Sequence, residues 1–208
     1  MRARMALWIA GIEVELREVK LANKPPELAE ASPKATVPVL VLDDGEVIDE
    51  SIAVARWALS QNDPENWLTG DDAELIAQAD GPFKHHLDRY KYPNRYEDEP
   101  GFGPEAGGVD HQAEGLTILK EWDARLAKHG QMTGPKRSLA DIALFPFIRQ
   151  FANHNRAWFD AQDLPHLHPW LEAHLASDLF TSIMPKFTPW KNGDAPIAFG
   201  PYIEAPQD

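Results

Sequence analysis

The sequence predicts an α/β domain at the N-terminus followed by an all-helical domain at the C-terminus. In the first sixty residues, segments with helical spacing of apolar residues alternate with short segments of strand spacing. Residues 61–72 are polar and rich in turn formers, as expected of a linker. Beyond them, the apolar segments recur with helical spacing. We therefore place one domain at residues 1–62 and a second at 69–208.

The N-terminal domain is expected to open with a helix. Met1, Met5 and Trp8 share one helical face, and Gly11 ends the segment, because glycine readily adopts the left-handed conformation that closes many helices. The alternation of apolar and acidic residues that follows is typical of a strand. That strand is expected at residues 12–16. The later elements of this domain are a loop and short helix with Pro25 and Pro26 near its start, a hairpin around an Asp-Gly turn, and a final helix, within residues 22–35, 36–49 and 50–60 in turn.

The second domain is expected to contain only helices and loops. Its helical segments are 71–92, with a kink at Gly81-Pro82, then 113–130, 138–153 and 168–184. The segment at 138–153 is apolar almost throughout, which predicts a central position. Residues 93–112 predict a long loop, and the proline-rich tail after residue 185 is expected to be irregular.

The composition excludes several kinds of protein. With 33 acidic and 20 basic residues, the chain has a net charge of -13, which disfavours binding to nucleic acid. No apolar run approaches the ~20 residues that span a bilayer, so no membrane partner is expected. The chain has 0 cysteines, which excludes disulfides, thiolate metal sites and a thiol nucleophile among these residues. A cytoplasmic protein fits best.

Pro38 is the first residue that suggests a binding site. It lies inside the apolar segment Thr-Val-Pro-Val-Leu, where proline removes one hydrogen bond of a strand ladder. An edge strand explains this simply. A cis peptide bond after Val37 is the alternative, because it would leave the backbone of Val37 free to pair with an extended peptide ligand.

A second signal is Asp49-Glu50-Ser51 at the start of the helix after the hairpin. These residues suit an ordinary helix N-terminus, where acidic groups interact favourably with the helix dipole. The functional alternative is an amino-acid head group. The helix N-terminus and the Ser51 hydroxyl would then bind its carboxylate, and Glu50 would bind its ammonium group.

Two further groups of residues are interpreted as structural. Ser138 and Asp141 are spaced as a capping box at the start of the apolar helix, whose loss should cost about 1–2 kcal/mol. The histidines include His85-His86 and the pair at 166 and 168. Neighbouring side chains on a helix point apart and no carboxylates complete either pair, so no metal site is expected.

The sequence resembles the glutathione S-transferase family, most closely its omega-type and related bacterial members. The resemblance rests on the Thr-Val-Pro-Val-Leu segment, on Asp-Glu-Ser twelve residues later, and on Ser-Leu-Ala-Asp in a helical second half. The resemblance implies a thioredoxin-like N-terminal domain and glutathione as substrate or ligand. It assigns Lys24 to the glycyl carboxylate of glutathione, Val37 with Pro38 to the backbone of its cysteinyl unit, and Glu50 with Ser51 to its γ-glutamyl group.

The same resemblance implies that something precedes Met1. Members of the family begin with a strand and a Cys-Pro-Tyr/Phe-Ala turn before the helix with which this chain opens. We therefore expect the first strand and the catalytic Cys or Ser to lie outside these residues, and we assign no catalytic residue. The absent strand would leave backbone groups in the sheet unpaired. A start codon assigned to an internal Met and a true truncation both explain this pattern.

The function implied by the resemblance is glutathione-dependent transfer or thiol reduction, with an unknown hydrophobic or disulfide co-substrate. A non-catalytic binder of glutathione or hydrophobic ligands and an interaction scaffold remain the alternatives. A homodimer is expected, because the helix at 50–60 is too apolar to be covered by the sheet alone and the family typically dimerises near it.

Overall fold

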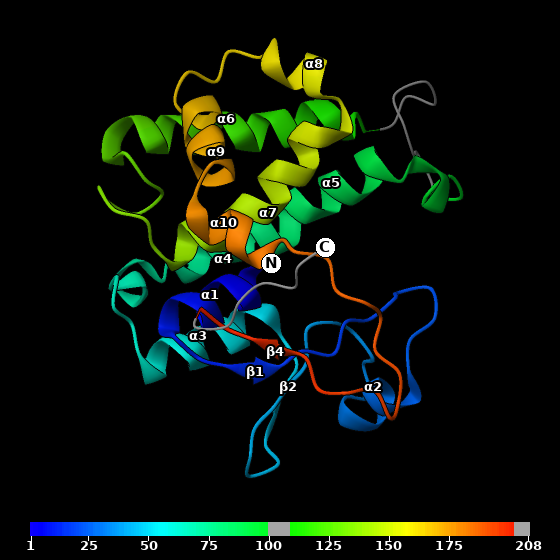
Figure 1. Cartoon of the computed structure of the whole chain (residues 1–208). Coiled ribbons are helices and arrows are strands. Elements are labelled where there is room, and N and C mark those ends of the chain that lie inside the picture. Colours follow the sequence, from blue (N-terminus) through cyan, green and yellow to red (C-terminus); the bar gives the residue numbers. More distant parts are fainter. Residues whose placement is uncertain (100–108, 202–208) are drawn as a thin grey trace. The chain divides into compact units, whose positions relative to one another are not determined.

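The computed structural model describes residues 1–99 and 109–201, which form two compact units (Figure 1). Unit 1 combines Met1–Leu68 with the chain from Ala176 on, and unit 2 is Thr69–Leu175. Part of the loop expected at 93–112 and the end of the tail, 100–108 and 202–208, lie outside the described residues.

Two helices form the core of unit 1. Helix α1 (Arg2–Ala10) packs against α3 (Ser51–Gln61), and Gly11 ends α1 with a φ of 72° in the left-handed region, as predicted. Most apolar side chains of α3 are buried without a second subunit, whereas Ala53 is exposed and Trp57 half-buried; the buried ones are Ile52, Val54, Ala55, Ala58 and Leu59. The face of α1 differs from expectation, because Arg2 is buried while Trp8 is only half-buried.

The C-terminal segment belongs to unit 1. Helix α10 (Asp178–Ile183) contacts α1, and strand β4 (Ala198–Phe199) pairs antiparallel with β1 (Val14–Glu15) (Figure 1). Its pairing continues past the strands, because the Leu16 N–H donates to the Ile197 carbonyl at 2.7 Å. The expectation of a wholly irregular tail in the helical domain was therefore wrong for this strand.

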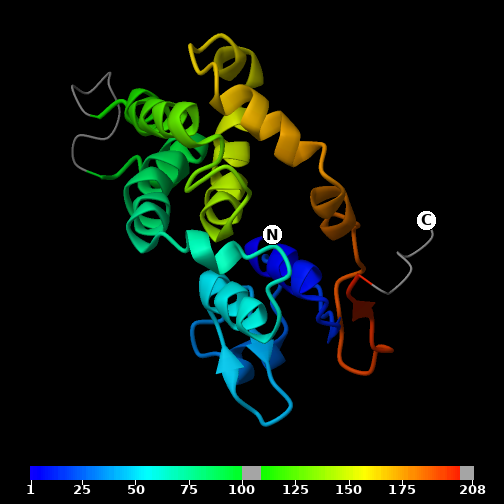
Figure 2. The same ribbon diagram turned by 90° about the vertical axis from the view of Figure 1, so that its left-hand side faces the viewer.

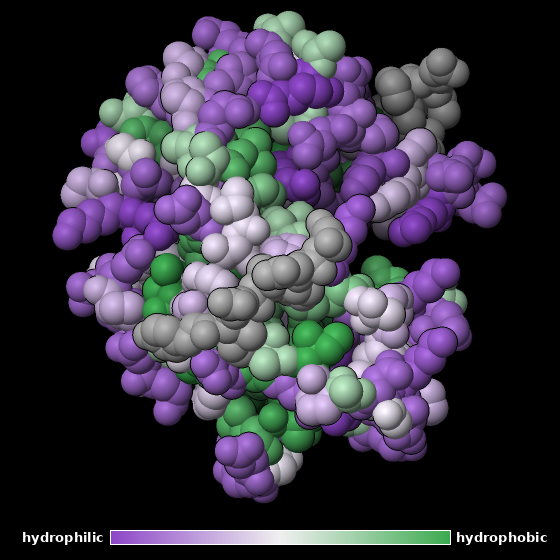
Figure 3. All heavy atoms as spheres, viewed as in Figure 1, coloured by the Kyte–Doolittle hydropathy of each residue, from purple (hydrophilic) through white to green (hydrophobic). Residues whose placement is uncertain are grey.

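The predicted hairpin consists of β2 (Leu40–Val41) and β3 (Val47–Ile48), which pair antiparallel. Gly45 has a φ of 89° in the turn, a conformation that favours glycine. Helix α2 (Pro26–Ala31) precedes the hairpin. Figure 3 shows hydrophobic side chains along the hairpin and hydrophilic ones at its tip; Val41 and Val47 are the exposed apolar residues of its strands.

The described residues of unit 2, 69–99 and 109–175, form helices joined by loops. Its α-helices are α4 (Ala73–Gln78), α5 (Lys84–Lys91), α6 (His111–His129), α7 (Leu139–His154), α8 (Arg156–Asp160) and α9 (Leu167–Leu175). A π-helical turn, η2 (Ala79–Phe83), joins α4 to α5 at the predicted Gly81-Pro82 irregularity, and a short 3-10 helix, η3 (Pro93–Arg95), follows α5. As expected, α7 lies at the centre, in contact with α4, α5, α8 and α9 (Figure 2).

The expected linker is more ordered than its composition suggests. A 3-10 helix, η1 (Trp67–Gly70), lies within it, and Trp67 is fully buried. The Asp63 carboxylate fixes this turn by accepting hydrogen bonds from the N–H groups of Trp67 and Leu68 at 2.8 and 2.9 Å.

None of the helices in the described residues is both long and apolar enough to span a membrane.

Candidate functional site

The Val37–Pro38 peptide bond is cis, as the sequence analysis anticipated. Val37 is 44% exposed, and no hydrogen bond joins its backbone to another residue within 1–99 or 109–201. A free N–H and C=O in an exposed segment can pair with the backbone of a peptide ligand.

The register of the hairpin places this segment beside the start of α3. Leu40 pairs with Ile48, and the next pair lies one residue further toward the turn. Pro38 lies two residues before the first pair and Glu50 two residues after it, so the cis-proline segment enters the hairpin, and the start of α3 leaves it, at the same open end.

The N-terminus of α3 has no side-chain cap. Glu50 occupies the N-cap position in an extended conformation, and no side chain in the described residues caps the first turn of the helix. The Ser51 hydroxyl also makes no hydrogen bond there. Uncapped N–H groups and the positive end of the helix dipole are suited to bind a carboxylate or another anion.

A lysine that the sequence analysis did not single out completes this region. Lys34 Nζ lies 3.2 Å from Asp49 Oδ1 and 2.9 Å from Glu50 Oε1, and the Ser32 hydroxyl donates to Asp49 Oδ2 at 2.9 Å. The hydrogen bonds from Ser32 and Lys34 lower the pKa of Asp49, and those to Glu50 and Asp49 raise the pKa of Lys34. The two carboxylates therefore already hold an ammonium group.

These features together suit a zwitterionic ligand. The uncapped helix N-terminus accepts a carboxylate, the acidic pair accepts an ammonium group, and the exposed strand segment accepts an extended backbone. An amino-acid head group joined to a short peptide has all three.

The box at Ser138 and Asp141 is a structural feature of unit 2. Both of its halves are present, and the buried Asp141 carboxylate also accepts hydrogen bonds from the Met132 N–H at 2.9 Å and from Trp170 Nε1 at 3.0 Å. Burial raises the pKa of Asp141, opposed by these hydrogen bonds. Gly70 lies against Ser138 so closely that an added Cβ would sit 2.4 Å from the serine Cβ. The box thus connects three segments of the unit.

The histidines are arranged differently from the expectation. His85 and His86 lie in α5 with their ring centroids 5.0 Å apart, and His111 at the start of α6 joins them. The argument that neighbouring histidines on a helix point apart does not hold for this pair, and no local sequence signal places a third ring beside it.

Comparison with known proteins identifies the family. A model of the glutathione S-transferase N-terminal domain matches residues 1–61, and a model of the glutathione S-transferase C-terminal domain matches residues 73–173. The chain belongs to the glutathione S-transferase family.

Individual relatives agree with this assignment. Glutathione S-transferase U19 of Arabidopsis thaliana is 28% identical over 194 residues, which cover 89% of this chain and 84% of the relative. A glutathione S-transferase domain-containing protein of Marinobacter aquaeolei VT8 has the same fold, with a TM-score of 0.68 and 22% identity over 86% of this chain and 93% of that one. A structure of glutathione S-transferase-I bound with lactoylglutathione matches with a TM-score of 0.67 and 21% identity over 88% and 91% of the two chains.

Membership of the glutathione S-transferase family supports the thioredoxin-like architecture expected for the N-terminal domain and the helical one expected for the second. Of the residues that the resemblance assigned, Val37 and Pro38 lie just before β2, and Glu50 and Ser51 lie just after β3. Lys24 lies in the exposed segment before α2, and no ion pair or hydrogen bond joins it to another residue in the described part of the chain.

Proposed function

We propose that this glutathione S-transferase family chain binds glutathione at the open end of the β2–β3 hairpin. The observation that carries the proposal is the uncapped N-terminus of α3 directly beside Asp49 and Glu50, which already hold the ammonium group of Lys34. A γ-glutamyl group presents one carboxylate and one ammonium group close together, and this arrangement matches both.

Each part of the tripeptide has a partner in the proposed complex. The first turn of α3 and the Ser51 hydroxyl bind the γ-glutamyl carboxylate, and Glu50 binds its ammonium group, which replaces Lys34. The backbone of Val37 pairs with the cysteinyl unit. Lys24, exposed and without an ion pair in residues 1–99 and 109–201, turns toward the glycyl carboxylate.

The proposed chemistry is glutathione-dependent transfer or thiol reduction on a hydrophobic or disulfide co-substrate. These residues include 0 cysteines, so within them the only thiol in this proposal is that of glutathione, and the nucleophile position is expected outside them. The relatives named glutathione S-transferase and the family member solved with lactoylglutathione support glutathione as the ligand.

Isothermal titration of the full chain with reduced glutathione tests the proposal. Glu50→Gln and Ser51→Ala should each weaken binding at least tenfold, because each removes a partner of the γ-glutamyl group. Ser60→Ala is the matched control: this serine lies in the same helix, is exposed, and bonds only to the Trp57 carbonyl and Gln61. Glutathione binding that is absent in the wild type, or equal in all four proteins, would contradict the proposal.

The homodimer and the cytoplasmic location also remain proposals. The absence of cysteine fits a reducing compartment. Most apolar side chains of α3 are buried within unit 1, so α3 offers a second subunit mainly Ala53 and the half-buried Trp57. The exposed Val41 and Val47 on the hairpin are apolar surface that a second subunit would cover. Small-angle scattering at micromolar concentration should give the mass of a dimer, and a monomer would refute this part.

A further inference from the structure

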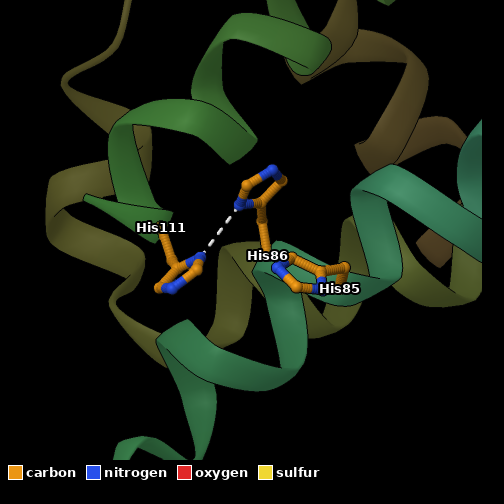
Figure 4. A group of neighbouring side chains, drawn as sticks. All are labelled: His85, His86 and His111. Atoms are coloured by element: carbon orange, nitrogen blue, oxygen red, sulfur yellow. Dashed lines mark hydrogen bonds between the residues drawn. The ribbon is translucent and has the colours of Figure 1, made fainter. Parts of the chain in front are cut away.

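Three histidines from two helices meet at one point of unit 2. His85 and His86 follow each other in α5, and His111 is the first residue of α6 (Figure 4). The start of α6 is held in place by its N-cap, since the Asp110 carboxylate accepts hydrogen bonds from the N–H groups of Gln112 and Ala113 at 3.0 and 3.1 Å. The position of the third ring is therefore fixed by the helix.

The spacing of the rings is close to that of metal ligands. One ring nitrogen from each histidine lies within 4.8 Å of the other two, and the Nδ1 atoms of His86 and His111 are 2.9 Å apart. Zinc binds imidazole nitrogens at about 2.0–2.1 Å in tetrahedral sites, which puts neighbouring nitrogens about 3.3 Å apart. Small rotations of the three side chains would bring all three nitrogens to that spacing.

Each neutral imidazole ring has one nitrogen lone pair that can bind a metal ion. Arg89 lies beside the cluster, where it donates to the His85 carbonyl and is paired with both carboxylate oxygens of Glu99.

The cluster is accessible to an ion. His85 is exposed, His86 is half-buried, and His111 is 9% exposed. An ion held by the three nitrogens would thus keep one position open to water, as sites with three protein ligands do. The net charge of -13 favours the approach of a cation.

We propose that His85, His86 and His111 bind a divalent transition-metal ion, and that zinc is the ion that fits best. Imidazole ligands favour zinc, copper and nickel over magnesium or calcium, and zinc readily accepts a tetrahedral arrangement of three nitrogens and one water. The ion joins α5 to α6, and because it binds the folded unit, it stabilises unit 2 by an amount that grows with the free zinc concentration. This proposal is independent of glutathione binding.

The test uses the full chain without a histidine tag, stripped of metal by a chelator. Zinc chloride is added in a calorimetric titration, and thermal unfolding is followed with and without zinc. Cobalt chloride serves as a spectroscopic probe, because tetrahedral ligation by nitrogen produces visible absorption bands far more intense than those of hydrated cobalt. His85→Gln and His86→Gln remove ligands, and His129→Gln is the control, an exposed histidine at the far end of α6.

The proposal predicts one zinc ion per chain, a higher unfolding temperature with zinc, and visible cobalt bands. His85→Gln and His86→Gln should weaken zinc binding at least tenfold and remove the cobalt bands, whereas His129→Gln should behave as the wild type. Circular dichroism of the metal-free variants shows whether they are folded; His85, being exposed, can be replaced with little effect on folding. A zinc dissociation constant above 1 mM (a binding free energy weaker than about -4 kcal/mol) would overturn the proposal. Zinc binding that His85→Gln leaves unchanged would overturn it as well.

Discussion

Replacing Asp141 by alanine should destabilise unit 2 more than any ordinary helix cap would. The carboxylate is fully buried and accepts four hydrogen bonds. Two of them come from the Ser138 N–H and hydroxyl, and the others come from the Met132 N–H and the Trp170 indole. The substitution removes the acceptor of all four donors at once.

The magnitude depends on which donors keep another partner. Trp170 Nε1 also bonds to Gln131 Oε1 at 2.8 Å, and the Ser138 hydroxyl lies 2.8 Å from Thr133 Oγ1. The N–H groups of Met132 and Ser138 have no other acceptor in the described part of the chain. Each buried donor without a partner costs about 1–3 kcal/mol. Part of this cost is offset, because the variant no longer buries a carboxylate away from water. We therefore expect the free energy of unfolding to fall by about 2–4 kcal/mol.

Urea unfolding followed by circular dichroism measures this loss. Ser138→Ala is the comparison, and should cost only about 1 kcal/mol, because the Ser138 N–H keeps the Asp141 carboxylate as its acceptor. Glutathione binding should be unchanged in both variants. An Asp141→Ala protein that unfolds at the wild-type urea concentration, or that loses no more stability than Ser138→Ala, would refute the reasoning.

Three further predictions concern unit 2. Gly70→Ala should destabilise it by roughly 1–3 kcal/mol in urea unfolding, because its Cβ would clash with Ser138, whereas Gly134→Ala, with no atom within 4 Å of the added Cβ, should be neutral. Burial, with a smaller effect from a nearby arginine, lowers the pKa of His174 to about 4. The unfolded chain therefore binds more protons than the folded one between about pH 6.5 and pH 4. The free energy of unfolding of the wild type should fall by about 2 kcal/mol between pH 7 and pH 5, and His174→Phe should not show this loss. Arg156→Ala should cost less than about 1 kcal/mol in the same assay, because its ion pairs are largely exposed.

The features that the sequence predicted correctly depend on local signals. The end of α1 at Gly11 and the hairpin turn at Gly45 require backbone conformations that favour glycine. The capping box needs only a serine and an aspartate three residues apart, and the order of the proline and acidic segments was enough to place the hairpin before α3.

The features that the sequence did not reveal depend on contacts between distant residues. Lys34 reaches carboxylates 15 and 16 residues away, and His111 meets His86 across 25 residues. Strand β4 consists of Ala198 and Phe199 only, too short for an alternating pattern, and it exists because β1 offers an edge to pair with. Neither composition nor periodicity encodes such pairings.

Chemical-shift mapping by NMR tests the location of the glutathione site most directly. On titration of the ¹⁵N-labelled chain with reduced glutathione, we expect the amide signals of Val37, Glu50 and Ser51 to shift together, with one common dissociation constant. The amide of Ser60, at the other end of α3, should stay in place and serves as the internal reference. Shifts confined to other residues, or no shifts at the start of α3 at millimolar glutathione, would contradict the account.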